Sequence, residues 1–171
     1  MILPEVRDPR LVTIRRGGTL TDSDHHLLAL WAAACAEHVL PLFESSAPDD
    51  RRPRLAIDAV RGWARGEVTM MDSRAAGGHA MGAARELRGA PRFAAYAAGQ
   101  AAVTAHVAEH DLGAAAYAIK AVQAAAGAEH SAPAGVREHH WQLAELPAGI
   151  RELVLEDQRA RNALCWHVFG D

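Results

Sequence analysis

Histidines are the residues of this 171-residue chain whose spacing most invites chemistry. His106 and His110 stand four positions apart, which would place two imidazole rings on one side of a helix, as a metal site can require. The glutamate of this segment directly precedes the second histidine, whereas in the zinc-protease motif it follows the first. We interpret His110 as a residue near a helix C-terminus, where the dipole favours its charge, and keep a metal site as the weaker alternative. No cofactor is predicted.

A second polar group lies on two predicted helices that cover about residues 72–87 and 91–110. A buried imidazole needs a partner for each ring nitrogen, so His38 and His79, which stand in apolar patterns, are interpreted first as satisfied core histidines. The alternative is a polar pocket that binds a ligand between the two helices. The residues that would converge there are His79, Gln100, Thr104 and His106.

The sequence lacks the common catalytic and nucleotide-binding motifs. It has no Gly-x-Ser-x-Gly elbow, no phosphate-binding loop and no Cys-x-x-Cys pair. Its acidic residues show no pairing typical of an acid/base couple. Cys35 and Cys165 stand in apolar helical patterns, where a free cysteine is usually buried. We therefore predict no catalytic residue and favour a role other than catalysis.

Alanine dominates the composition and predicts the fold class. The chain has 38 alanines, of which 22 fall within residues 75–126, while aromatic residues make up only 5%. Alanine is the best helix former, and β-branched residues are few in this stretch. We predict an all-α, single-domain antiparallel helical bundle or a stack of helix pairs, with about six or seven helices and a short extended N-terminal arm.

Caps, prolines and apolar spacing set the expected helix ends. The first helix should start between Thr21 and Asp24 and kink or end at Pro41. Before it, residues 1–20 form the predicted arm, packed on a helical domain of residues 21–171; Arg15 and Arg16 precede a Gly-Gly turn signal there. The further helices are expected at about 53–68, 72–87, 91–110, 111–127, 133–146 and 150–168.

Charge and terminal sequence exclude several classes of protein. The net charge is -3, and arginines are spread along the chain rather than gathered into the basic stripe of a nucleic-acid binder. The first ten residues, MILPEVRDPR, lack the apolar run of a signal peptide, and no uncharged stretch is long enough to span a membrane. The expectation is a cytoplasmic protein that binds neither nucleic acid nor membrane.

Several segments of the sequence are similar to those of one bacterial family. They include LVTIRRGGTLT at 11–21, LWAAACAE at 30–37, WARGE at 63–67 and TAHVA at 104–108, together with residues 157–159 and 165–166 near the end. In these segments the chain resembles the immunity proteins of bacterial polymorphic toxin systems that form the immunity-protein-five-like family. The resemblance covers nearly the whole chain and implies an all-helical protein of the cytoplasm.

The resemblance also implies a partner, because such proteins are expected to bind and neutralise a cognate toxin. It transfers no catalytic residue. The polar residues that exceed the needs of packing form the predicted binding surface: Arg15, Arg16, Trp63, Arg65, Glu67, His79, Gln100, Thr104 and His106. Two alternatives stand beside this reading. One is a helical metal-dependent hydrolase or small-ligand-binding protein that uses the histidine pocket, and the other is a homo-oligomeric scaffold assembled through Ala-rich faces.

Overall fold

The computed structural model describes residues 3–170. Within that range the only β structure is an isolated bridge between Thr13 and Leu20. This confirms the prediction of an all-α, single-domain protein with six or seven helices. The helices are α1 (Asp22–Glu44), α2 (Arg52–Ala64), α3 (Met70–Ala83), α4 (Gly89–Val103), α5 (His110–Ala126), α6 (Ser131–Ala144) and α7 (Arg151–Arg161), with single 3-10 turns η1 (Pro9–Leu11), η2 (Ile14–Arg16), η3 (Ala128–His130) and η4 (Ala148–Ile150).

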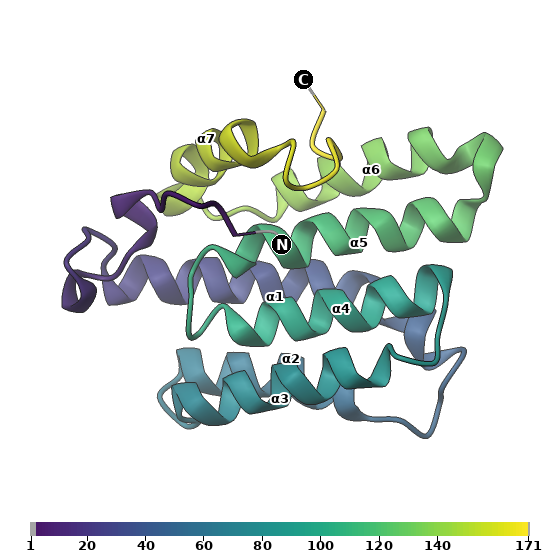
Figure 1. The fold of residues 1–171 in the computed structure, drawn as a ribbon, viewed down its shortest axis with the longest axis horizontal. Helices are drawn as coiled ribbons and strands as arrows, with labels where there is room; N and C mark the ends of the chain where they lie inside the picture. The colour runs from purple at the N-terminus through teal and green to yellow at the C-terminus, as the bar shows by residue number, and fades with distance from the viewer. Residues whose placement is uncertain (1–2, 171) are drawn as a thin grey trace.

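The helices form a layered bundle with α1 and α4 at its centre. Figure 1 shows α4 and α5 side by side, with α2 and α3 below them, α6 and α7 above, and α1 behind. α1 contacts α2, α4 and α5, and α4 contacts α1, α2, α3 and α5, so these two helices lie at the centre of the core. The N-terminal segment, the α2–α3 turn and the α4–α5 loop all lie at the left end of the bundle in this view.

α1 is held at its start by the predicted cap, because the Thr21 hydroxyl accepts a hydrogen bond from the Asp24 amide. The helix does not end at Pro41 but continues to Glu44, since a proline in the last turn removes only one backbone donor. Its length and composition would suffice to cross a membrane. Trp31 and Phe43 are nevertheless buried in the core, so packing within the bundle accounts for its apolar character.

Alanines of α4 and α5 form the contact between these two helices and their neighbours. On α4 the alanines from Ala94 to Ala102 are all buried, and Ala114, Ala115, Ala116 and Ala118 are buried on α5. Small side chains allow helix axes to approach closely. These Ala-rich faces are therefore covered within the chain. On α3, Gly77 is buried in close contact with α4, whereas the neighbouring Gly78 faces open space.

The N-terminal segment is wound into two 3-10 turns. Leu11 and Leu20 are buried in the same core as the helices, which fixes the segment to the end of the bundle. The second turn, η2, ends at Gly17, whose φ of 85° lies in the left-handed region that glycine adopts without strain. As a result Arg15 and Arg16 sit in a short turn anchored on both sides.

α4 is shorter than predicted, and this changes the setting of two candidate residues. It ends at Val103, where the Thr104 hydroxyl donates back to the Gln100 carbonyl at 3.1 Å, and α5 begins only at His110. Val103, Thr104 and Val107 are β-branched and have low helix propensity, so the chain leaves the helix there. The predicted helix over 91–110 is wrong in its last two turns.

Candidate functional site

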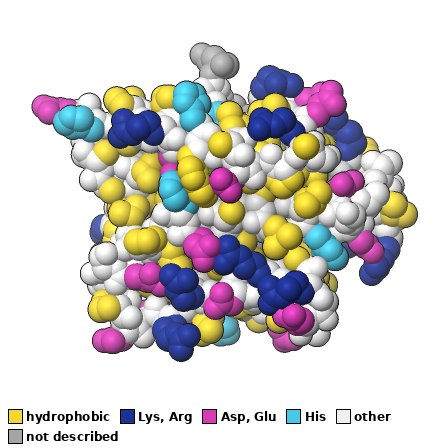
Figure 2. Space-filling model, turned by 180° about the vertical axis from the view of Figure 1, so that it is seen from behind, with side chains coloured by type: hydrophobic (Ala, Val, Ile, Leu, Met, Phe, Trp, Pro, Cys, Tyr) yellow, Lys and Arg dark blue, Asp and Glu magenta, His cyan; other side chains and the backbone are white. Residues whose placement is uncertain are grey.

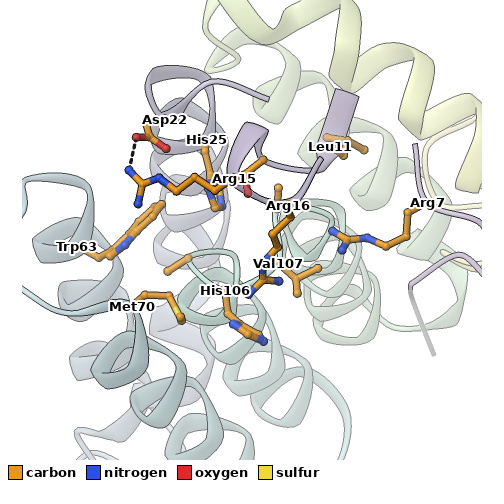
Figure 3. Close-up of a pocket in the computed structure, with 13 residues that line it drawn as sticks. Arg7, Leu11, Arg15, Arg16, Asp22, His25, Trp63, Met70, His106 and Val107 are labelled. Carbon is orange, nitrogen blue, oxygen red and sulfur yellow. Dashed lines mark hydrogen bonds and ion pairs between the residues drawn. The ribbon is translucent and has the colours of Figure 1, made fainter. Parts of the chain in front are cut away.

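A pocket of about 240 Å³ opens at the end of the bundle beneath the N-terminal segment. Five parts of the chain line it: the N-terminal segment, the start of α1, the end of α2, the start of α3 and the α4–α5 loop. Figure 3 shows Arg15 turned toward Asp22 and Trp63, while Arg16 reaches toward His106 and Val107. The lining residues with charged, aromatic or sulfur-containing side chains are Arg7, Arg15, Arg16, Asp22, His25, Trp63, Met70 and His106.

The structure brings four of the predicted surface residues together in this pocket. Arg15 and Arg16 come from η2, Trp63 from the last turn of α2, and His106 from the α4–α5 loop. Arg65 and Glu67 are not among the lining residues: they lie exposed in the turn after α2 and pair with each other at 2.6 Å.

The other predicted residues do not converge as expected. His79 is exposed on α3, whereas Thr104 is buried and bonds to its own helix. Gln100 joins α3 to α5, because its amide contacts the Met81 sulfur at 3.8 Å and accepts a hydrogen bond from His110. The predicted pocket between α3 and α4 is therefore wrong. His79 points outward there, and the end of α4 at Val103 turns His106 into a different cavity.

His106 and His110 do not share a helix face, so their interpretation as an i,i+4 pair is wrong. His106 lies in the loop, and His110 is the first residue of α5 rather than a residue near a helix C-terminus. The positive N-terminal end of a helix disfavours a charged imidazole. Burial is the main cause that lowers the pKa of His110 to about 4, and its Nδ1 donates to Gln100 Oε1 at 2.7 Å.

The low pKa of His110 predicts an acid-dependent loss of stability. In the unfolded chain this imidazole titrates near pH 6.5, so between pH 6.5 and 4 the unfolded state binds the proton more tightly and is favoured. We expect His110→Gln to remove about 2–3 kcal/mol of the pH dependence of unfolding between pH 7 and 4. Urea titrations at several pH values would measure it. His140→Gln is the control, because His140 is exposed. If the free energy of unfolding depends on pH equally in both variants, His110 is not the source of the acid-dependent loss.

Within the described range no three His, Cys, Asp or Glu side chains are grouped closely enough to hold a metal ion. His106 and His110 have separate surroundings, as described above. The thiols of Cys35 and Cys165 are both free and buried, as predicted, and burial raises the pKa of each. The described residues therefore offer no ligand set for the metal-dependent alternative.

His25 is a pocket residue that the sequence interpretation missed. It is buried, and its Nε2 donates to the Thr104 carbonyl at 2.7 Å, which ties α1 to the end of α4. The rings of His25 and His26 both meet Trp63 edge-on, with centroids 4.8 and 4.7 Å away. Two successive histidines thus fix the indole at the mouth of the pocket. Their adjacency in the sequence gave no sign of this, because only the fold brings α2 beside them.

A buried charged network lies beside the pocket. Arg7 donates two hydrogen bonds to the Glu109 carboxylate, at 2.6 and 2.5 Å, and that carboxylate is fully buried. Arg161 of α7 donates to the Glu109 carbonyl at 2.9 Å and also binds Asp157 and Asp111. The network joins the N-terminal segment, the α4–α5 loop and α7. The i,i+4 spacing of Asp157 and Arg161 was the available sequence signal.

The charges on the opposite face of the molecule are largely compensated. Figure 2 shows basic and acidic side chains intermixed over the lower part of that face. Between α1 and α2, Arg54 binds Glu44 at 2.7 Å and Arg61 binds Glu37 at 2.6 Å. Two of the three pocket arginines are also paired, Arg7 with Glu109 and Arg15 with Asp22, but all three line one cavity.

The pocket is equipped to bind an anionic group. Three guanidinium groups and two imidazoles line it, and its carboxylate, that of Asp22, is already paired with Arg15 at 2.7 Å. Guanidinium groups match the planar, bidentate geometry of carboxylate and phosphate. This arrangement would suit the recognition of a negatively charged group beside an aromatic wall.

Comparison with known proteins places the chain in a family. Residues 18–149 match the model of the family described as Imm-5 like putative immunity protein. No curated protein and no solved structure matches the chain. The matched range includes Trp63, His106 and the walls that they form, while Arg7, Arg15 and Arg16 precede it. The match confirms the resemblance seen in the sequence, and the chain belongs to the Imm-5 like putative immunity protein family.

Proposed function

We propose that this protein binds a cognate toxin and neutralises it in a stoichiometric complex, in the cytoplasm of the cell that makes both. The family match over residues 18–149 carries the proposal, because the family is described as one of immunity proteins. Neutralisation by binding requires a well-formed surface and no catalytic group. A rigid helical bundle with a recessed, charged site at one end suits that task.

The face around the pocket is the proposed contact with the toxin. Arginine and tryptophan are the residue types that most often anchor protein interfaces, and Arg15, Arg16 and Trp63 meet here. Arg65 and Glu67 follow Trp63 in the chain and extend this end of the bundle. Two large apolar side chains next to lining residues, Ile14 and Met71, are exposed, as expected of a surface that a partner covers.

The test is co-expression with the product of the neighbouring gene that carries a toxin-like domain. We expect the two purified proteins to form a complex of fixed stoichiometry, measured by size-exclusion chromatography with light scattering. Growth of cells that express the toxin should be restored by this protein. Mass spectrometry of the toxin released from the complex should find it unmodified, since the proposed neutralisation involves no turnover.

Three results would count against this function. A gene neighbourhood without any toxin-like domain would remove the partner. Failure to form a complex with a folded neighbouring toxin would contradict binding directly. Recovery of a chemically altered toxin would indicate an enzyme instead. Light scattering of the isolated protein also tests the scaffold alternative, which predicts a homo-oligomer in the absence of any partner.

A further inference from the structure

Arg16 is distinguished from the other basic residues of the pocket by its lack of an acidic partner. Arg7 is bound by the buried carboxylate of Glu109, and Arg15 by the solvent-exposed carboxylate of Asp22. Within residues 3–170 no carboxylate lies at ion-pair distance from Arg16, whose side chain extends along the pocket toward His106 (Figure 3). A guanidinium group carries five N–H donors, so Arg16 offers the pocket donors that no other described residue accepts.

His106 adds a second unused polar group to the same wall. Its Nδ1 is buried and has no hydrogen-bond partner among the described residues. Burial lowers the pKa of His106, and the positive charges of Arg16, Arg74 and Arg7 lower it further. The ring therefore stands in a positive potential that an anion would compensate. A buried polar atom without a partner is uncommon in native proteins and calls for an explanation.

The volume of the pocket restricts what can fill it. At about 240 Å³ it is smaller than the cavities of about 300–1,000 Å³ that usually enclose small-molecule ligands and cofactors. A carboxylate on a short aliphatic stem fits within such a volume, whereas a nucleotide does not. The size thus favours a group presented from outside over an enclosed metabolite.

The rim of the pocket indicates that the incoming group belongs to a protein. Trp63 and Met70 form apolar parts of the wall, and Ile14 and Met71, the neighbours of lining residues, are 62% and 54% exposed. Tryptophan, methionine and arginine are enriched at protein interfaces, while exposed apolar side chains add nothing to the capture of a free ion. An acidic side chain on a partner surface would satisfy both the pocket and its rim.

We propose that this pocket receives an aspartate or glutamate side chain of the partner protein, with its carboxylate bound by Arg16 and His106 and its flanking chain packed on Trp63 and Met70. The inference rests on the proposed function, because it takes the toxin as the partner. Arg7 and Arg15 keep their own carboxylates, and the contact of Arg7 with the buried Glu109 ties the N-terminal segment to the α4–α5 loop. Negative charge on the partner thereby becomes the feature that selects it for this otherwise acidic protein.

The first experiment measures affinity for the purified product of the neighbouring toxin gene by calorimetry. Arg16→Glu places a negative charge where the partner carboxylate would bind, and we expect the Kd to rise about 100-fold or more. Arg16→Gln should have a smaller effect in the same direction. Arg137→Glu is the matched control, because Arg137 is exposed on α6, which contributes nothing to the pocket lining. It should change the Kd less than threefold.

The second experiment uses the isolated protein and needs no toxin. Sodium acetate and inorganic phosphate are titrated separately while NMR follows the His106 ring and the Trp63 indole N–H. We expect both signals to shift saturably with acetate in the wild type and in Arg137→Glu, and not in Arg16→Glu. Far-UV circular dichroism checks that each variant is folded. Arg16 lies in a surface turn without side-chain partners among the described residues, so its replacement should not disturb folding.

The two experiments separate failure of the inference from failure of the proposed function. A complex in which Arg16→Glu weakens binding no more than Arg137→Glu would overturn the carboxylate site and leave the immunity function standing. Acetate binding without any complex would overturn the protein origin of the carboxylate together with the proposed function. Absence of a saturable shift with acetate would overturn the site itself. Saturation by phosphate at tenfold lower concentration than acetate would replace the acidic side chain by a phosphorylated ligand.

Discussion

Replacing Arg161 with methionine is expected to lower the free energy of unfolding by about 3–5 kcal/mol at neutral pH, because it leaves the buried carboxylate of Asp157 without its counter-charge. The Arg161 side chain is 3% exposed, and its partners Asp157 and Asp111 are 6% and 0% exposed. Arg161 also donates to the Glu109 carbonyl, so its loss would weaken the attachment of α7 to the α4–α5 loop. Methionine keeps the aliphatic volume and isolates the effect of charge.

The pH dependence of this loss has a definite sign. Burial is the main cause that raises the pKa of Asp157, and burial followed by the charge of Asp157 raises the pKa of Asp111 to about 8. Removal of the Arg161 charge should raise the pKa values of Asp157 and Asp111 further. The folded variant would then bind protons that the unfolded chain does not. Its stability should recover as the pH falls from 8 toward 5.

Arg159→Met is the matched control, since Arg159 lies on the same helix but is exposed to solvent. Surface substitutions of this kind usually change stability by less than about 0.5 kcal/mol. Urea unfolding of the wild type and both variants at pH 8, 6.5 and 5 provides the measurement. Similar small losses in the two variants, without pH dependence, would mean that the network contributes little to holding α7.

The second large effect is expected at Gly77, where α3 meets α4. A Cβ atom added there would lie 2.7 Å from Val103 Cγ1 and 2.8 Å from the Gly99 carbonyl oxygen. The backbone oxygen cannot move without shifting α4, so Gly77→Ala should force the helices apart. We expect a loss of about 1–3 kcal/mol, the usual range for overpacking a core.

For Gly78→Ala, one residue away, we expect a gain in stability instead of a loss. A Cβ atom at Gly78 would meet nothing within 4 Å, and alanine is the better helix former, so this variant should gain about 0.5–1 kcal/mol. In a chain of this size the melting temperatures of the two variants should differ by about 5–10 °C. Thermal unfolding followed by circular dichroism measures the difference. Equal melting temperatures would show that α3 and α4 can separate freely, against the geometry described.

Much of the fold was accessible from the sequence because helices depend on local features. Alanine content, apolar spacing and the Thr21 cap predicted the helices, and Cys35 and Cys165 were recognised as buried free thiols. Helix ends were less predictable. Val103 and Thr104 end α4 through small differences in propensity that neighbouring contacts decide, and the interpretation of His106 and His110 depended on that end.

The candidate site also depends partly on local sequence and partly on tertiary packing. The sequence by itself determined which residue types were available, and Arg15, Arg16, Trp63 and His106 were each recognised as polar or aromatic side chains in excess of packing needs. Only the tertiary structure decided that these four share a pocket and that Gln100, Thr104 and His79 do not. The tertiary structure also places Arg7, Asp22 and His25 in the wall of this pocket. The physical reason is that helix formation is governed by contacts within a few residues, whereas the pocket is made by packing segments that are far apart in the chain.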